Sequence, residues 1–169
     1  MKNNEMLSKM IKLATTHHNG QFDKSGMPYI LHCLKVMDLL NTKDIELMCI
    51  AVGHDLIEDT DITENILRTE GISERVINGI LSLTKIDGED YDDYKVRVKK
   101  NPDAVLVKIA DLTHNTNIDR LKVITQKDMD RTLKYYQFYI ELIDIKRNAS
   151  RLAIATINDS YEKQVYNRV

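Results

Sequence analysis

The sequence predicts an all-α protein that forms a single domain. Only two prolines and six glycines interrupt its 169 residues, and apolar residues recur at helical spacing through most of the chain. No series of segments shows the alternation of apolar and polar residues that a β-sheet requires. The length fits one domain with a proper core, and no internal repeat or linker divides it, so we expect one domain over residues 1–169.

Residues typical of helix ends delimit the predicted helices. Gly20 lies just past an amphipathic first segment, and Pro28 suits the first turn of a second helix. Asn101 and Pro102 offer an N-cap and a first-turn proline for a later helix. The third predicted helix is apolar over much of its circumference, which indicates a central position. The expected helices lie around residues 7–14, then at 29–40, 44–57, 63–70, 73–83, 91–99 and 103–117, with one or two long helices over 127–162.

Composition and charge exclude several classes of protein. The net charge is −2 and the pI is near 6.2, so no general basic field attracts nucleic acid. No apolar run approaches the roughly 20 residues of a membrane helix, and charged residues interrupt the N-terminus, which argues against a signal peptide. Cys33 and Cys49 match no metal or redox spacing and are expected as free core thiols. We therefore expect a cytoplasmic protein.

The segment AVGHDLIEDT raises the question of how a cluster of acidic residues is neutralised. His54, Asp55, Glu58 and Asp59 follow directly on an apolar run, and burying unpaired carboxylates there is costly. A cation bound among them would remove this cost. Because neighbouring residues of a helix point about 100° apart, His54 and Asp55 can reach one ion only at a helix end or over the groove between them.

Two residues elsewhere in the chain complete a candidate metal site. His32 lies early in the second predicted helix, and Asp111 is a polar residue amid the apolar neighbours of VLVKIADLTHN. Together with His54 and Asp55 they offer two imidazoles and two carboxylates, with coordination positions left open. Such a set favours Mn²⁺, Fe²⁺ or a similar octahedral ion over a closed structural zinc site.

The order of these four residues resembles the pattern of the HD-domain metal-dependent phosphohydrolases. The blocks KSGMPYILH, HDLIEDTDIT and VKIADLTHN resemble, more specifically, the hydrolase domain of RelA/SpoT homologues and the small alarmone hydrolases. Those enzymes remove the 3′-pyrophosphate from guanosine tetra- and pentaphosphate. The resemblance covers about residues 5–145 and leaves 146–169 as a C-terminal helical extension. It implies an HD-type helical bundle with a central divalent metal, Mn²⁺ before others.

The resemblance also implies roles for the two acids that follow the His-Asp pair. Glu58 and Asp59 match a family pair that positions and deprotonates the attacking water beside the metal. Glu58 lies three residues after Asp55 and four after His54, which on a helix places it on their face. Asp59 lies one turn after Asp55. Both are therefore expected as catalytic residues.

Two further positions are expected to bind substrate. Asn115 lies one turn after Asp111, where the family uses an asparagine to hold the sugar of the nucleotide. Lys24, in the loop before His32, matches a family lysine that meets phosphate or base.

The same loop departs from the family pattern at one position. Alarmone hydrolases carry an arginine that stacks on the guanine immediately before that lysine, whereas this chain has Asp23. A carboxylate cannot stack as a guanidinium does and would repel phosphate, so we expect the base to be held weakly. Ile118 likewise stands where those enzymes usually place a polar or small residue.

Several other polar residues have ordinary structural explanations. Asp111 on its own could simply pair with Lys108, and His114 is expected to pack or form a hydrogen bond rather than to bind metal. His17 and His18 suit a helix C-terminus. The basic run YKVRVKK suits a solvated face, or a patch that steers phosphate. Core packing is favoured over base stacking for Tyr135, Tyr136 and Tyr139.

The whole pattern predicts an alarmone 3′-pyrophosphohydrolase that acts on a guanosine nucleotide. An HD phosphohydrolase for another nucleoside phosphate is the first alternative. A non-catalytic nucleotide-sensing module is the second, although a decayed site would be expected to lose some of its metal or acid residues. We expect no nucleic-acid or membrane partner, and the sequence leaves the oligomeric state open.

Overall fold

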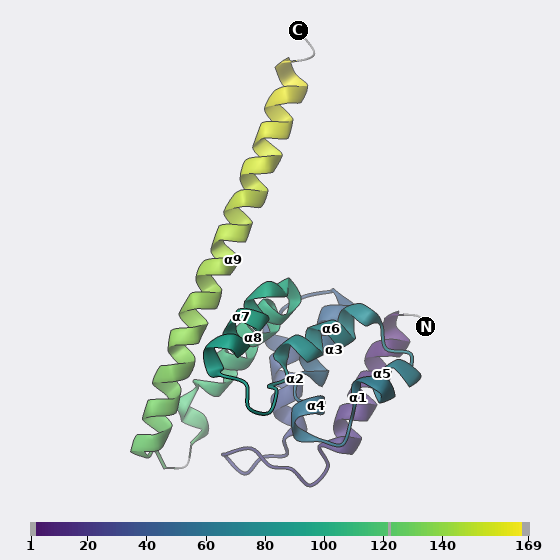
Figure 1. Cartoon of the computed structure of the whole chain (residues 1–169), viewed down its shortest axis with the longest axis vertical. Helices are drawn as coiled ribbons and strands as arrows, with labels where there is room; N and C mark the ends of the chain where they lie inside the picture. Colours follow the sequence, from purple (N-terminus) through teal and green to yellow (C-terminus); the bar gives the residue numbers. More distant parts are fainter. Residues whose placement is uncertain (1–2, 122, 167–169) are drawn as a thin grey trace.

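The computed structural model describes residues 3–121 and 123–166, which form helices joined by short loops. Within these ranges there is no β-strand, only an isolated bridge between Phe22 and Pro28. The predicted all-α class is therefore confirmed. Figure 1 shows a bundle of short helices from which one long helix extends.

The helices follow one another closely along the chain. Their order matches the prediction, with small shifts at the ends and one additional break. The elements are α1 (Asn3–His17), α2 (Ile30–Leu39), α3 (Ile45–Gly53), α4 (Leu56–Asp59), α5 (Glu64–Thr69), α6 (Glu74–Leu83), α7 (Tyr91–Lys100), α8 (Pro102–Asn115), the 3₁₀ helix η1 (Ile118–Arg120) and α9 (Gln126–Tyr166).

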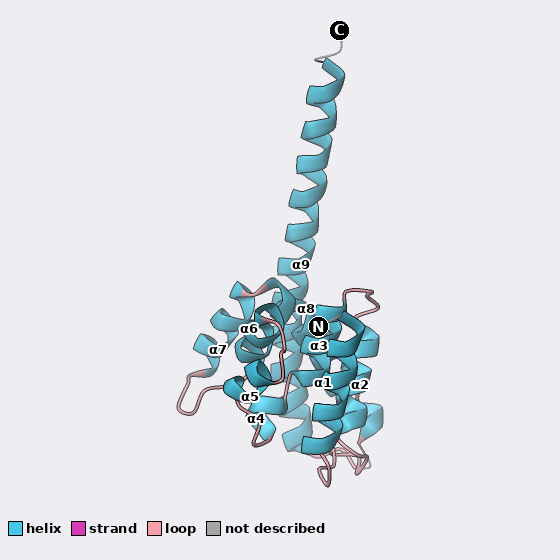
Figure 2. Ribbon diagram, turned by 90° about the vertical axis from the view of Figure 1, so that its right-hand side faces the viewer, coloured by secondary structure: helices cyan, strands magenta, loops and turns pink. Residues whose placement is uncertain are grey.

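Helix α3 is the centre of the bundle, as its apolar sequence predicts. It packs against α1, α2, α6 and α8, and its residues from Cys49 to Gly53 are buried; Figure 2 shows α1 and α2 beside it. Two glycines allow α3 to pack closely against α1 and α6. A Cβ at Gly53 would lie 2.8 Å from the sulfur of Met10, and one at Gly79 in α6 would lie 2.5 Å from Cδ1 of Ile50.

Side-chain caps determine where most helices begin. Asn101 accepts hydrogen bonds from the amides of Asp103 and Ala104, and Pro102 occupies the first turn of α8, as predicted. These caps satisfy amide groups that a helix start otherwise leaves unpaired. The same role at α3, α5, α6 and α7 is taken by Asp44, Thr63, Ser73 and Asp90.

The predicted third helix is wrong at its C-terminal end. Helix α3 ends at Gly53, His54 is its C-cap, and Asp55 adopts φ −104° and ψ 0° before the one-turn helix α4 begins at Leu56. Apolar residues lie on both sides of this turn, so periodicity does not reveal it. Because of the break, Glu58 does not share a continuous helix face with His54 and Asp55.

The last predicted helices form one helix, α9. Its first turns pack on α8 and α7, with Phe138 and Leu142 completely buried. Residues 146–156 are exposed, and Figure 1 shows this half of α9 leading away from the bundle. The exposed part begins where the sequence places the C-terminal extension; the boundary between core and extension stays a prediction.

The two cysteines are core residues, as predicted. Cys33 and Cys49 are buried and form no disulfide. Burial raises the pKa of both thiols, that of Cys49 to about 12, which keeps them unreactive. Among the described helices none is both long and apolar enough to cross a bilayer.

Gly79→Ala should destabilise the protein, because the new Cβ would overlap the side chain of Ile50. Overpacking of this kind costs about 1–3 kcal/mol. Urea unfolding measures the loss, with Asn78→Ala on the exposed side of the same helix as the control. Gly79→Ala combined with Ile50→Val should lose less than the sum of the two single variants. If the loss of stability in the double variant equals the sum of the two single losses, the two side chains do not overlap as described.

Candidate active site

The break between α3 and α4 positions two of the predicted metal ligands. Nδ1 of His54 lies 2.8 Å from the carbonyl oxygen of Ala51, which can only accept, so this nitrogen carries a proton. Nε2 of His54 is buried and forms no hydrogen bond with the described residues, although Oδ2 of Asp55 lies 2.9 Å away. A ring that is oriented through one nitrogen and leaves the other without a hydrogen bond is typical of a metal ligand.

His32 enters the centre from α2 in a similar orientation. Its Nε2 lies 3.6 Å from Oδ2 of Asp55 and 3.3 Å from Oδ1 of Asp111. Its Nδ1 lies 2.7 Å from Nδ1 of His114. Burial and the charges of Arg120 and His32 lower the pKa of His114 to about 4, so the neutral His114 accepts this hydrogen bond. His32 therefore presents Nε2 to the centre, and His114 has the hydrogen-bonding role that the sequence predicts.

Asp111 reaches the same centre from α8. Its Oδ1 lies 3.3 Å from Nε2 of His32 and 3.8 Å from Nε2 of His54. Lys108 donates to Oδ2 at 2.8 Å, and the side-chain amide of Asn115 donates to Oδ1 at 2.5 Å. The carboxylate is thus buried and held at both oxygens. Asp111 thus pairs with Lys108, as the sequence allows, and also lies close to both imidazoles.

The four predicted ligands form one compact group. One ligand atom each of His32, His54 and Asp55 lies within 4.8 Å of the other two, and Asp111 is within 3.8 Å of both imidazoles. Burial raises the pKa of both carboxyls, but the neighbouring cations hold it well below its usual range. Burial lowers the pKa of His54, whereas the charges of Asp55 and Asp111 raise it to about 10. The group therefore holds a positive charge strongly, and its donor set fits a divalent metal ion in place of a proton.

Tyr29 belongs to this centre although the sequence does not assign it a role. Its hydroxyl donates to Oδ2 of Asp55 at 2.6 Å, and burial and the charge of Asp55 raise its pKa, so it stays neutral. Hydrogen bonds of this kind orient metal-binding carboxylates. Its place three residues before His32 is the one signal in the sequence, and a packing tyrosine would give the same signal.

The two predicted catalytic acids lie on or beside α4 in different surroundings. Glu58 accepts hydrogen bonds from Lys85, from the amide at 3.0 Å and from the ammonium at 3.2 Å. The amide of Asp59 donates to the carbonyl of Asp55 at 2.9 Å, which keeps Asp59 one helical turn from that ligand. Burial and the charges of Asp55 and Glu58 raise the pKa of Asp59. A carboxyl group with a raised pKa beside a charged centre is a candidate for proton transfer.

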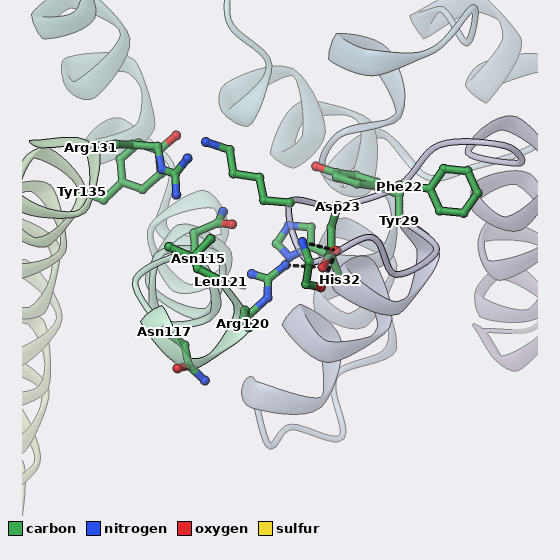
Figure 3. A pocket seen from close by; sticks show the side chains of 12 residues that line it. Phe22, Asp23, Tyr29, His32, Asn115, Asn117, Arg120, Leu121, Arg131 and Tyr135 are labelled. Carbon is green, nitrogen blue, oxygen red and sulfur yellow. Dashed lines mark hydrogen bonds and ion pairs between the residues drawn. The ribbon is translucent and has the colours of Figure 1, made fainter. Parts of the chain in front are cut away.

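A cavity of about 250 Å³ lies beside the centre, and both predicted substrate-binding residues line it (Figure 3). Lys24 comes from the loop between α1 and α2, and Asn115 from the last turn of α8. Because His32 also lines the cavity, a molecule bound there lies against one of the predicted metal ligands. Arg120, Arg131 and Tyr135 are among the other lining residues, and the sequence did not assign them to substrate binding.

A second cavity of about 420 Å³ adjoins the first and is strongly cationic. Arg131 and Tyr135 line both cavities. Lys85, the partner of Glu58, connects the second cavity with a predicted catalytic acid. Such an excess of positive charge suits phosphate groups. The cations that line it are Lys85, Lys108, Lys127, Arg131 and Lys134, together with the acid Asp130.

The positions of Tyr135 and Arg131 of α9 at the cavities could not be deduced from the sequence. Core packing was favoured for Tyr135; its side chain packs on the core and also lines both cavities. Arg131 lies one helical turn earlier, and this spacing is the only hint in the sequence. Both reach the site because α9 folds back across α8.

The basic run YKVRVKK serves the fold rather than the site. Arg97 binds the carboxylate of Glu89 and two backbone carbonyl oxygens at the end of α6. Lys95 and Lys99 both bind Glu141 of α9. The alternative that this run steers phosphate is therefore not supported.

Asp23 does not repel anions in the way that the sequence suggested. Its Oδ2 lies 2.6 Å from Nη2 of Arg120, and Oδ1 accepts hydrogen bonds from Ser25 and Met27. Burial raises the pKa of Asp23, but the hydrogen bonds from Ser25 and Arg120 hold it well below its usual range. The carboxylate of Asp23 is thus ionised, and the guanidinium of Arg120 balances its charge. Its partner lies 97 positions away, so no local pattern could reveal it.

Comparisons with known proteins agree with the resemblance. No family model matches the chain. It is 34% identical over 115 residues to the guanosine-3′,5′-bis(diphosphate) 3′-pyrophosphohydrolase of Haemophilus influenzae, which covers 61% of this chain and 17% of that protein. It is 28% identical over 174 residues to a GTP pyrophosphokinase of Myxococcus xanthus, which covers 94% of this chain and 22% of that protein. The chain thus spans less than a quarter of the length of these curated relatives.

A solved structure has a similar fold. It is that of a metazoan ortholog of SpoT, described as hydrolysing ppGpp and playing a role in starvation responses. The TM-score is 0.66 at 19% identity, and the match covers 85% of this chain and 95% of that one. The chain thus has the helical fold of an HD-domain hydrolase. Its resemblance to the hydrolase domain of RelA/SpoT homologues is confirmed.

Removing one predicted ligand should abolish the stabilisation that a divalent metal gives. Mn²⁺ at about 100 times its Kd should add about 2.7 kcal/mol to the free energy of unfolding of the parent protein. His54→Ala and Asp111→Asn should each lose most of this gain, because each removes a donor atom. Thermal unfolding of chelator-treated protein with and without Mn²⁺ measures it. Asp119→Asn, an exposed acid of η1, is the control, and a parent-like gain in either ligand variant would contradict the site.

Proposed function

We propose that this chain is a metal-dependent phosphohydrolase that removes the 3′-pyrophosphate from guanosine tetraphosphate and pentaphosphate. The observation that carries the proposal is the compact, largely buried group of two histidines and two aspartates beside cavities lined with cations. Relatives named guanosine-3′,5′-bis(diphosphate) 3′-pyrophosphohydrolase, from Haemophilus influenzae and Aquifex aeolicus among others, support this choice of substrate.

In this proposal His32, His54, Asp55 and Asp111 hold a divalent metal ion, with Mn²⁺ as the expected one. When bound, the ion would supply Lewis acidity, which polarises a phosphoryl oxygen and makes a water easier to deprotonate. The hydrogen bonds at Nδ1 of both imidazoles keep Nε2 directed at the centre. The ligand set would thus need little rearrangement to bind the ion.

Glu58 and Asp59 would act on the attacking water. The raised pKa of Asp59 suits a group that accepts a proton and later returns it. Glu58 is held in place by its two hydrogen bonds from Lys85, so its carboxylate can orient the water beside Asp59. The pair would therefore divide the positioning of the nucleophile and the transfer of its proton.

The cations around the two cavities would bind the phosphates. A guanosine bis(diphosphate) carries one diphosphate on each side of the ribose, and the two adjoining cavities offer separate places for them. Lys24 and Arg131 both lie near the same oxygen of Asp128, at 3.9 and 3.3 Å, so they form one cationic group. Asn115 donates its amide hydrogen to Asp111, which leaves its amide oxygen for a sugar hydroxyl.

Protein loaded with Mn²⁺ should release pyrophosphate from guanosine tetraphosphate, and an excess of chelator should stop the release. Chromatography of a panel of nucleotides measures the reaction and tests the alternative of another nucleoside phosphate. Full turnover in chelator, with the metal content verified as negligible, would rule out the metal mechanism. A panel without any turnover would leave the non-catalytic module as the better explanation.

Glu58→Gln combined with Asp59→Asn should leave metal binding intact but remove most of the turnover. General-base assistance typically contributes about 10²–10⁴-fold, and the double variant should lose a factor in this range. Asp61→Asn, an exposed neighbour that pairs with His17, is the matched control and should keep the parent rate. If the double variant binds metal and turns over like the parent, the assigned roles are wrong.

A further inference from the structure

An ion pair joins two segments of the cavity wall that lie far apart in the sequence. Asp23 belongs to the loop between α1 and α2, and Arg120 is the last residue of η1. Their Oδ2 and Nη2 atoms are 2.6 Å apart, and Nη1 of Arg120 donates to the carbonyl oxygen of His114 at 3.0 Å. Figure 3 shows the guanidinium of Arg120 beside Asp23, and both residues line the cavity.

Asp23 is itself held firmly. Its Oδ1 accepts hydrogen bonds from the amide of Ser25 at 2.9 Å, from the hydroxyl of Ser25 at 2.5 Å and from the amide of Met27 at 2.9 Å. The side chain of Asp23 is only 10% exposed and that of Arg120 only 19%. The carboxylate is thus a fixed anchor at Nη2 of Arg120, and the carbonyl oxygen of His114 holds the same guanidinium at Nη1.

This anchoring divides the cavity into two chemically different parts. The hydrogen bonds of Arg120 lie along the edge of the guanidinium, so they do not occupy its flat faces. Its charge is compensated by Asp23, which suits a flat uncharged ring better than a phosphate. Lys24 and Arg131, which share one oxygen of Asp128, carry a net positive charge and suit phosphate.

We propose that Arg120 stacks on the base of the bound nucleotide and that Asp23 is the positioning residue that holds it for this contact. A planar, delocalised guanidinium stacks on a nucleobase, whereas an ammonium group has no plane to offer. The inference rests on the proposed function and names the residue that distinguishes a nucleotide from a simple polyphosphate. Asp23 then supports base binding, the opposite of the role that its charge suggested.

Arg120→Lys is the sharpest test, because it keeps a positive charge beside Asp23 and removes the plane. It should raise KM for guanosine tetraphosphate about tenfold and leave kcat nearly unchanged, since stacking contributes to binding in ground and transition states alike. The Kd of the Mn²⁺-loaded protein for GDP, measured by calorimetry, should rise by a similar factor. The Kd for inorganic pyrophosphate should not change.

A substitution of the anchor tests the positioning role. Asp23→Asn should also raise KM and leave kcat nearly unchanged, because it weakens the contact that holds Arg120 and introduces no repelling charge. Circular dichroism and thermal unfolding verify that the variant is folded.

Two results would overturn the inference. One is an unchanged KM and an unchanged Kd for GDP in Arg120→Lys. The other is an equal loss of affinity for pyrophosphate, which would make Arg120 a phosphate-binding residue. If the parent protein hydrolyses no guanosine tetraphosphate, the proposed function fails, but the comparison of GDP with pyrophosphate still decides whether Arg120 contacts a base.

Discussion

Two ionised carboxylates in the middle of a helical bundle, Asp111 buried and Asp55 largely so, are the constraint on which this structure depends. Each would be costly to bury alone, and each has neighbours that donate to it or carry positive charge. Tyr29 donates to Asp55, while Lys108 and Asn115 donate to Asp111. The two imidazoles then face an excess of negative charge. A divalent cation balances this group better than protons on the histidines, because it also satisfies the nitrogen that is left without a hydrogen bond.

The parts of the fold that local chemistry determines could be predicted from the sequence. Asn101 caps α8 because an amide side chain followed by proline suits a helix start wherever it occurs. The break after Gly53 was not apparent from periodicity, because apolar residues lie on both sides of the turn formed by His54 and Asp55. That break places His54 and Asp55 at a helix end, which is one of the two arrangements that allow adjacent residues to reach one ion.

The candidate metal ligands could be predicted because few residue types can bind a metal, and three blocks of sequence carry them in a known order. The groups around the ligands are of common types, and their roles depend on where the backbone brings them. Tyr29 and Tyr135 could equally be packing residues, and one of them binds Asp55 while the other lines the cavities. The pair of Asp23 and Arg120 bridges 97 positions, so only the folded chain reveals that the acid has a partner.

Helix α9 completes the site although none of the three sequence blocks lies in it. Phe138 and Leu142 are buried against the core, and Tyr135, one turn before Phe138, lies on the same side of the helix. The packing that attaches α9 to α8 therefore also places Tyr135 and Arg131 in the walls of both cavities. From Lys146 to residue 156 the side chains are exposed and take no part in this packing. The candidate site thus requires the first half of α9, because without it both cavities would lose a wall and part of their positive charge.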